Sequence, residues 1–399
     1  MGQTAVRDVM LGRRPAAESL LRGHPWVWAE AIGKSHGMGQ GQAAPGEEVQ
    51  VLAPDGTPLG RGLADPGSPI AVRMWTRRRD PIDGALWRSR VAHALELRAA
   101  LFDGTRTDAV RLIHGEGDRM PGFVVDRYAS VTVLRTDGDG AAARIADFVQ
   151  ALWPRLARMG VRSLVHRSGK KGEPPRLDRL EGAEPPETVR VEEHGVPFVV
   201  DLARGQKTGA FLDQRDNRRR VGELASARRV LNLFSYAGGF SIHAALGGAT
   251  HVTSVDVAAA AHATAQASFQ LAGVDPRAHA FVTADVQAFL EGARGRGETW
   301  DLVVSDPPSF AANERALPRA LAAYRALHRG CAGVLATGGI LCAASCSSHV
   351  HAEAFLSTLD DAALGGRALT VLELRGPGAD HPVPAAFPEG RYLKFAVLA

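Results

Sequence analysis

The chain has 399 residues, of which 45% are hydrophobic and 23% are charged, as in ordinary soluble globular proteins. This length exceeds one ordinary core and predicts about two or three domains, and no apolar run approaches the length of a membrane span. The net charge of +4 by itself points to no class of partner, so the distribution of charge is more informative.

Two segments are strongly basic. Residues 73–98 hold seven arginines against three acids, and residues 155–171 hold six basic residues and no acid. Such segments suit a phosphate backbone, although a solvated surface explains either one equally well. The three cysteines crowd into residues 331–346, which forms neither a disulfide framework nor a metal knuckle. We therefore expect a cytoplasmic protein without a bound metal.

The first half of the chain predicts two domains. In residues 1–75 a Pro-Asp-Gly-Thr turn between alternating segments predicts a small β domain. Residues 76–200 mix strand and helix periodicities and predict an α+β domain. The expected strands are 48–52, 59–64, 70–75, 111–114, 122–126, 130–134 and 163–166, with 111–114 and 122–126 as a hairpin. The expected helices are 82–102 and 142–159, and residues 172–186 are expected to form a loop.

Residues 201–399 predict an α/β domain, because short, wholly apolar strands alternate with helices. This alternation indicates a Rossmann-like parallel sheet with helices on both faces. The expected strands are 230–234, 252–255, 280–283, 302–305 and 340–344, and helices are expected to begin at 240 and 258.

The first of these strands leads into a glycine turn, Phe234 to Gly239, where doubly wound sheets hold a nucleotide. The dinucleotide spacing Gly-x-Gly-x-x-Gly is absent, which disfavours a pyrophosphate ligand and favours S-adenosylmethionine. At the next two strand ends, Asp256 is expected to accept the ribose hydroxyls and Asp285 the adenine amino group. Each aspartate alone fits a helix cap as well. Together, the glycine turn, Asp256 and Asp285 at three successive strand ends predict a cofactor site.

The run Asp306-Pro307-Pro308-Ser309-Phe310 follows a buried strand, and its two prolines make the turn rigid. An acid followed by prolines at this place resembles the substrate-facing motif of nucleic-acid methyltransferases. Enzymes that methylate exocyclic amines usually carry an aromatic directly after the prolines. This chain has Ser309 there, so an amine target is disfavoured.

Cys346 is expected at the carboxyl tip of the strand 340–344, on the same edge as Asp306. Cys331 and Cys342 fit small buried hydrophobes instead. A cysteine opposite an acid suggests methylation of cytosine C5: the Cys346 thiolate would add to C6, which makes C5 nucleophilic. Asp306 would hold N3 and the amino group of the base.

Segments along almost the whole chain resemble the bacterial 23S rRNA 5-methylcytosine methyltransferases of the RlmI type. These segments are residues 22–28, 62–75, 117–128, 206–218, 380–382, 387–390 and 392–394. The resemblance implies a PUA-like RNA-binding domain, a central domain and a methyltransferase domain, commonly in a homodimer. It also implies S-adenosylmethionine as cofactor, 23S rRNA as partner and Cys346 as nucleophile.

The motifs and the resemblance together predict the site. The expected cofactor residues are Phe211, Asp213, Gln214, Arg215, Asn232, Phe234, Ser235, Tyr236, Gly238, Gly239, Asp256, Asp285, Val286 and Asp306. The expected substrate residues are Pro307, Pro308, Phe310 and Lys207. Ordinary ion pairs at a helix start would explain the segment from Phe211 to Arg215 as well.

The family often has lysine where this chain has Ser309, and related two-cysteine enzymes have a second cysteine there that helps release the product. The base that removes the C5 proton is therefore unidentified, with Lys207 or a water as guesses.

Two rival hypotheses stay open. The chain could methylate guanine or an exocyclic amine with Cys346 as a structural residue, or it could be a non-catalytic RNA binder in ribosome assembly. The four residues Gly238, Asp256, Asp285 and Asp306 together argue against a binder without catalysis. A small-molecule methyltransferase is disfavoured, because it would not need two leading domains of this kind.

Overall fold

The computed structural model describes residues 6–33, 43–169, 175–311 and 313–399. The chain forms two compact units, each built from several segments. Unit 1 comprises Met1–Glu187, Leu202–Gly209 and Ala379–Pro388, and unit 2 comprises Thr188–Asp201, Ala210–Gly378 and Glu389–Ala399. Within the described ranges, no helix combines the length and the apolarity that crossing a membrane requires.

The first sheet of unit 1 has five strands in the order β1-β3-β4-β5-β2. The antiparallel neighbours β3, β4 and β5 confirm the three strands that the alternation predicts, whereas β1 pairs parallel to β3 and was not predicted. The elements are β1 (Arg7–Met10), α1 (Arg14–Arg22), β2 (Trp26–Trp28), η1 (Ala29–Ala31), β3 (Glu48–Leu52), β4 (Pro58–Ala64) and β5 (Ile70–Thr76).

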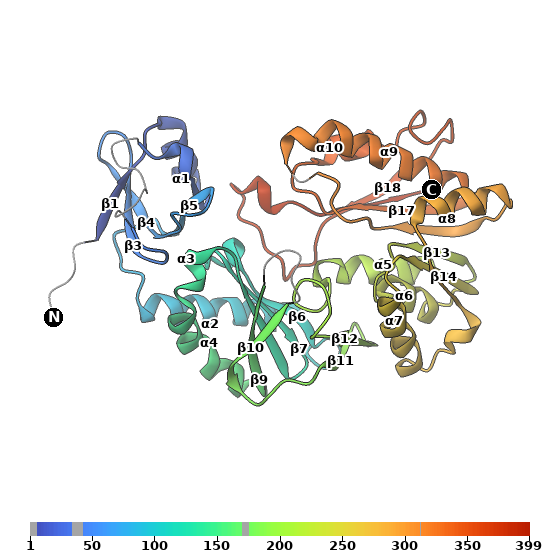
Figure 1. Ribbon diagram of the computed structural model, residues 1–399, viewed down its shortest axis with the longest axis horizontal. Helices are drawn as coiled ribbons and strands as arrows, with labels where there is room; N and C mark the ends of the chain where they lie inside the picture. Colours follow the sequence, from blue (N-terminus) through green and yellow to red (C-terminus); the bar gives the residue numbers. More distant parts are fainter. Residues whose placement is uncertain (1–5, 34–42, 170–174, 312) are drawn as a thin grey trace. The chain divides into compact units, whose positions relative to one another are not determined.

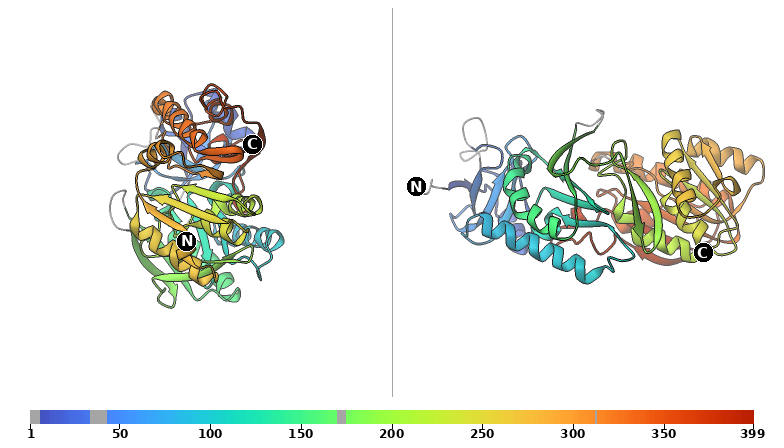
Figure 2. Two further views of the ribbon diagram at one scale, coloured as in Figure 1. Left: turned by 90° about the vertical axis from the view of Figure 1, so that its right-hand side faces the viewer. Right: turned by 90° about the horizontal axis from the view of Figure 1, so that it is seen from below.

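The second sheet of unit 1 has the order β10-β9-β8-β7-β6, and α2 and α4 lie side by side against it (Figures 1 and 2). The predicted hairpin is confirmed, because β6 and β7 pair antiparallel. Trp87, Phe123 and Phe148 form the aromatic centre of the core, with ring centroids of the two phenylalanines 4.4 Å apart. The elements are α2 (Gly84–Leu101), β6 (Ala109–His114), η3 (Gly115–Asp118), β7 (Phe123–Tyr128), β8 (Val131–Thr136), α3 (Asp139–Ala142), α4 (Ile145–Arg158), β9 (Ser163–Ser168) and β10 (Arg176–Gly182).

One expectation in this region is wrong and another is confirmed. The expected loop over 172–186 contains the edge strand β10, and residues 172–174 lie outside the described residues. Its content of Pro, Glu and Gly suggests a loop, but residues 176–182 pair with β9 as an edge strand, where charged side chains are common. The expected helix over 142–159 is confirmed as α4, which runs from Ile145 to Arg158 and follows the short helix α3 that ends at Ala142.

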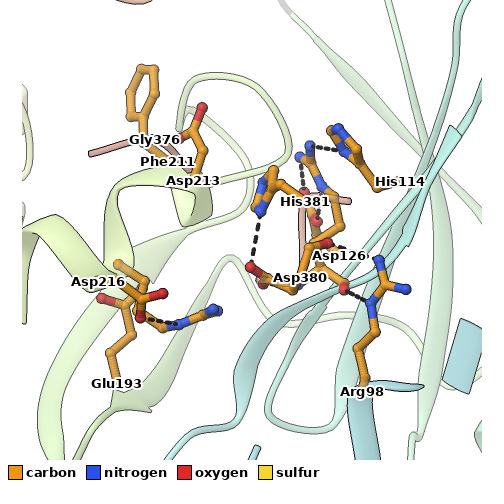
Figure 3. A network of polar contacts seen from close by, with 12 residues as sticks. Arg98, His114, Asp126, Glu193, Phe211, Asp213, Asp216, Gly376, Asp380 and His381 are labelled. Atoms are coloured by element: carbon orange, nitrogen blue, oxygen red, sulfur yellow. Dashed lines mark hydrogen bonds and ion pairs between the residues drawn. The ribbon is translucent and has the colours of Figure 1, made fainter. Parts of the chain in front are cut away.

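A segment from near the C-terminus completes unit 1. Arg98, 3% exposed, forms a bidentate pair with Asp118 and donates to the carbonyl of Asp380 at 2.7 Å. The carboxylate of Asp380 accepts from the backbone N–H of Arg111 at 2.9 Å and lies 2.9 Å from Nδ1 of His381. Figure 3 shows Asp380 and His381 beside Arg98. Buried charges require such partners, so these contacts fix the segment in place.

The sheet of unit 2 has seven strands in the order β15-β14-β13-β16-β17-β19-β18. The first five are parallel neighbours, which confirms the predicted parallel sheet. The strands are β13 (Arg229–Leu233), β14 (His251–Asp256), β15 (Ala280–Thr283), β16 (Trp300–Ser305), β17 (Leu335–Ser345), β18 (Val371–Arg375) and β19 (Lys394–Leu398). The helical elements are η4 (Leu212–Gln214), α5 (Arg215–Leu224), α6 (Gly239–Leu246), α7 (Ala259–Leu271), η5 (Pro276–Ala278), α8 (Val286–Gly295), η6 (Glu314–Ala316), α9 (Leu317–Gly333), α10 (Ala352–Leu356) and η7 (Pro388–Gly390).

Helices cover both faces of this sheet, as predicted (Figure 1). Alternate residues of a strand point to opposite faces. One face packs against α8, α9 and α10, and the other packs against α5 and α6. The strand residues of the first face include Leu231, Leu233, Val303, Leu341 and Ala343, and those of the second include Val230, Leu302, Val304, Ile340 and Cys342.

The sequence patterns did not predict four strands of unit 2. The strands β18 and β19 extend the sheet antiparallel, and β11 (Thr188–Glu193) and β12 (Val196–Asp201) form a separate hairpin. The backbone N–H of Val199 donates to the Ser268 hydroxyl at 3.1 Å, which ties the hairpin to α7.

Candidate active site

The predicted site residues of unit 2 gather along one edge of the sheet. The carboxyl ends of parallel strands meet at the same edge, and ligands bind there where the strand order reverses. The reversal lies between β13 and β16, because the chain runs from β13 outward to β15 and then returns to β16. Along this edge lie in sheet order Asp285, Asp256, the glycine turn, Asp306 and Cys346.

The glycine turn after β13 has an unusual backbone. Phe234 and Tyr236 have φ of 56° and 45°, and Gly238 has φ of 75°. A left-handed conformation is strained for a residue with a side chain, and such strain clusters at functional sites. A Cβ at Gly238 would lie 2.7 Å from the Cβ of Ala265. The position therefore requires glycine for both its φ and its close approach to α7.

Three backbone amides of this turn already have protein partners. The N–H of Ser235 donates to the carbonyl of Val255 at 3.0 Å, and that of Gly238 donates to the carbonyl of Ser235 at 2.8 Å. The N–H of Tyr236 donates to Oδ2 of Asp256 at 2.8 Å. A pyrophosphate would need such amides and would be repelled by the carboxylate. The turn therefore suits a nucleoside ligand without phosphate.

The two strand-end aspartates differ. Both oxygens of half-buried Asp256 accept backbone N–H groups, from Tyr236 and from Ala258 at 2.9 Å. A carboxylate oxygen has two lone pairs, so each can still accept a ribose hydroxyl. Exposed Asp285 caps α8, because its Oδ1 accepts from the N–H of Ala288 at 3.0 Å. Val286 follows as the first, buried residue of that helix.

A chain of buried side chains supports the turn from below. Asn232, 1% exposed, donates to the hydroxyl of Ser241 at 2.8 Å, and this hydroxyl lies 2.7 Å from that of Ser254. The hydroxyl of Ser235 lies 3.5 Å from Nε2 of His262. Asn232 and Ser235 therefore connect β13 and its turn to α6, β14 and α7.

The segment before α5 is held by a buried ion pair. Arg218 binds Glu193, which is 0% exposed, through both carboxylate oxygens, and donates to the carbonyl of Phe211 at 2.8 Å. Gly239 ends the glycine turn and begins α6, and a Cβ there would lie 2.8 Å from Cδ of Arg218. The ring of Phe211 meets that of Tyr236 edge to face at 5.4 Å. The structure therefore brings Phe211 to the glycine turn.

The neighbours of Phe211 contact other parts of the unit. Buried Asp213 accepts from the hydroxyl of Tyr392 at 2.7 Å, and Oε1 of Gln214 accepts from Asn217 at 2.7 Å. Arg215 is fully buried, with its Nε 3.6 Å from a carboxylate oxygen of Asp216. Part of the segment thus makes the ordinary contacts of a helix start.

The place between β13 and β16 where the strand order reverses is the switch point of the sheet. On its other side Cys346 follows directly after β17, as expected. Its Sγ lies 3.8 Å from the carbonyl oxygen of Pro307, so the cysteine meets the turn that begins with Asp306. Pro307 is buried and Pro308 is exposed. Phe310 packs on Tyr324 with ring centroids 4.8 Å apart.

The other two cysteines are buried, as expected from the sequence. Cys331 lies in α9 and Cys342 inside β17, both 0% exposed. Burial raises the pKa of each thiol to about 12. Neither thiol can ionise near neutral pH. Lys207, the remaining predicted residue, belongs to unit 1 and has φ of 54°.

Two ionisable residues near Cys346 escaped the sequence analysis. The Tyr324 hydroxyl donates to that of Ser345 at 2.9 Å, and burial raises the pKa of Tyr324 to about 12. Lys394 is 5% exposed at the start of β19, and burial lowers its pKa to about 8. No local pattern around either residue indicates the strand and helix pairing that brings it to Cys346.

Comparisons with known proteins agree with this geometry. Residues 154–379 match the model of an S-adenosylmethionine-dependent methyltransferase domain, and residues 13–77 match that of a PUA-like domain. Ribosomal RNA large subunit methyltransferase I of Aeromonas salmonicida is 37% identical over 386 residues, which cover 96% of each chain. The protein of the same name from Cronobacter sakazakii is 37% identical over 382 residues, covering 94% of this chain and 95% of its own.

Solved structures show the same fold. A methyltransferase crystallised with SAH superposes with a TM-score of 0.87 at 24% identity, over 98% of this chain and 100% of the other. A SAM-dependent methyltransferase from Streptococcus mutans reaches a TM-score of 0.85 at 23% identity, again over 98% and 100%.

Proposed function

Because the chain belongs to the S-adenosylmethionine-dependent methyltransferase family that includes ribosomal RNA large subunit methyltransferase I, we propose that it methylates C5 of a cytosine in 23S rRNA. Membership makes S-adenosylmethionine its cofactor. The relatives' name and the PUA-like domain support an RNA of the large subunit as substrate. The resemblance also predicts a homodimer, and a division into domains 1–75, 76–200 and 201–399.

One observation carries the choice of cytosine C5: the 3.8 Å contact between Sγ of Cys346 and the carbonyl oxygen of Pro307. It joins a nucleophile and the acid–proline–proline turn at the ligand-binding edge of the sheet. Cytosine C5 needs covalent activation at C6, whereas guanine and exocyclic amines offer nitrogen lone pairs and need no protein nucleophile. Since Cys331 and Cys342 are fully buried, Cys346 is the cysteine best suited to this role.

The glycine turn, Asp256 and Asp285 would hold the adenosine part of S-adenosylmethionine. Val286 at the start of α8 and Asn232 below the turn complete that side, and Phe211 closes it. Bound there, S-adenosylmethionine supplies an electrophilic methyl group. The occupied amides of the turn support this cofactor, because they leave no site for a pyrophosphate at those positions.

The chain's own residues then act on the base. The Cys346 thiolate forms a bond to C6, and the electrons of the C5–C6 double bond move onto the ring so that C5 becomes nucleophilic. The negative charge that the addition places on N3 is neutralised by a proton shared between N3 and the Asp306 carboxyl group, which also accepts a hydrogen bond from the amino group and so favours this adduct. After C5 has gained the methyl group, a water molecule takes the C5 proton, the electrons of the C5–H bond restore the C5–C6 double bond, and the Cys346 thiolate leaves from C6. The prolines fix Asp306, and Phe310 packs behind the turn.

The test is a covalent trap. In RNA that contains 5-fluorocytidine, C5 carries fluorine in place of the hydrogen that must leave as a proton. The covalent adduct should therefore persist and migrate as a protein–RNA band. We expect this band with the unchanged chain and none with Cys346→Ala, whose turnover on ordinary rRNA should fall at least about 1000-fold. Nucleoside mass spectrometry would locate the methyl group.

Cys342→Ala is the matched control, because it removes a buried thiol from β17, the strand that leads to Cys346, and should keep both the band and the activity. Full activity of Cys346→Ala, with the methyl group on a guanine or an exocyclic amine, would refute the cytosine proposal.

A further inference from the structure

We propose that Lys394 is a positioning residue that holds the Cys346 sulfur as a thiolate, an inference that rests on the proposed role of Cys346 as nucleophile.

The pairing of β19 with β17 brings the two residues together. In the antiparallel register Lys394 stands opposite Ser345, the last residue of β17 and the one before Cys346. The ammonium Nζ donates to the carbonyl of Ser347 at 2.5 Å and to that of Tyr392 at 2.7 Å. Its nitrogen is therefore fixed beside the carbonyl of Ser347, the residue that follows Cys346.

Burying the Lys394 ammonium costs free energy unless a negative charge lies nearby. Lys394 is 5% exposed, and burying an ammonium penalises its charged form. Two carbonyl dipoles offset only part of that penalty, because they carry partial charges. The pKa of Lys394 is lowered to about 8 by burial, and the charge of Cys346 acts in the opposite direction by raising it. At neutral pH the amine thus remains largely protonated.

Electrostatic coupling is reciprocal. Since the Cys346 thiolate stabilises the Lys394 ammonium, the ammonium stabilises the thiolate by the same free energy. Two described neighbours do not supply a positive charge: Tyr324 of α9 is neutral because burial raises its pKa to about 12, and Asp306 after β16 is an acid. Lys394 keeps its own proton in this role, and the thiol proton of half-buried Cys346 leaves to solvent.

The first experiment measures the rate of Cys346 alkylation by iodoacetamide against pH, in the full-length chain and in Lys394→Met. The thiolate is the form that reacts. We expect the midpoint of the pH profile to rise by about one unit in Lys394→Met, the lower end of the effect of a nearby opposite charge, so that alkylation near neutral pH slows about tenfold. Lys394→Arg keeps the charge and should stay near the unchanged profile.

Two controls separate this effect from a general one. Arg375→Met removes a cation from the adjacent strand β18, opposite Phe395 in the register, and should not move the profile. Cys346→Ser should abolish the labelling, since the other two thiols are buried with pKa values of about 12. An unchanged midpoint in folded Lys394→Met would overturn the proposal.

The second experiment does not depend on a lysine variant. The chain has five lysines, so NMR titration with ¹³Cε-labelled lysine can resolve Lys394. Its pKa should fall by a comparable amount in Cys346→Ser, and an unchanged value would overturn the coupling. The covalent trap with 5-fluorocytidine RNA tests Cys346 separately: a trapped adduct together with an unmoved alkylation profile would reject only the role of Lys394.

Discussion

The two sides of the switch point between β13 and β16 are built differently. On the cofactor side, backbone geometry dominates: a turn with three left-handed residues and carboxylates that accept backbone N–H groups. On the reaction side, buried ionisable side chains dominate, namely Tyr324, Lys394 and, further along α9, His328. A cofactor of constant shape can be bound by a fixed backbone. Covalent chemistry needs groups whose protonation the surrounding structure controls.

This contrast predicts that variants on the reaction side change turnover or pH dependence, whereas variants on the cofactor side change affinity for S-adenosylmethionine.

Among the variants that test this contrast, Asp306→Asn should have the largest effect. Loss of the carboxylate removes the group proposed to hold the base. We therefore expect the rate constant of methylation in single-turnover assays to fall about 100-fold. Asp301→Asn is the matched control at the other end of β16, where the carboxylate accepts the N–H of Arg229 at 2.8 Å. A turnover loss shared equally by both variants would show that damage to β16, rather than substrate contact, is responsible.

The reaction side should also make stability depend on pH. His328 is fully buried in α9, and burial lowers its pKa to about 4. The folded state therefore binds fewer protons than the unfolded state between about pH 6.5 and pH 4, so its stability is full above that window and falls as the pH falls through it. Between pH 7 and pH 4, the free energy of unfolding measured with urea should fall by about 3 kcal/mol less in His328→Gln than in the unchanged chain.

Buried His243 also has a lowered pKa through burial, so the unchanged chain will lose more stability than His328 explains. The comparison between the two proteins isolates His328. Parallel pH profiles of the two unfolding free energies would contradict the prediction.

Gly238→Ala should weaken both the fold and the cofactor site. The alanine must adopt a left-handed conformation and push against Ala265, which we expect to cost about 2 kcal/mol and to reduce S-adenosylmethionine affinity in calorimetry. Gly273→Ala is the control: its φ is 73°, but nothing lies within 4 Å of the added Cβ. It should cost about 1 kcal/mol and leave cofactor binding unchanged. If both variants bind S-adenosylmethionine with equal affinity, the glycine turn is not part of the cofactor site.

The smallest effect is expected at Asp285. Asp285→Ala should lose the cap of α8, about 1 kcal/mol in thermal unfolding, together with cofactor affinity. Asp285→Ser can still cap the helix but lacks the carboxylate, so it should recover stability and not affinity. If serine restores both properties, Asp285 is a cap and not a ligand.

The sequence alone determined the parallel sheet and the order of its strand ends. Wholly apolar strands between amphipathic helices admit few other arrangements, and the missing dinucleotide spacing already disfavoured a pyrophosphate ligand. The same logic placed Cys346 at a strand tip and identified Cys331 and Cys342 as buried. These predictions succeeded because each depends on residues close together in the chain.

Other features were decided only by the tertiary structure. Lys394 lies beside Ser345 and Ser347 because β19 pairs antiparallel with β17, and Asp380 joins Arg98 in unit 1 although 282 positions separate them in the chain. Edge strands such as β18 and β10 carry charges that resemble loop sequences. Their pairing depends on hydrogen bonds between backbones, and these leave little trace in side-chain periodicity. Which buried charges are compensated, and therefore which groups hold or lose a proton, follows from such long-range pairing.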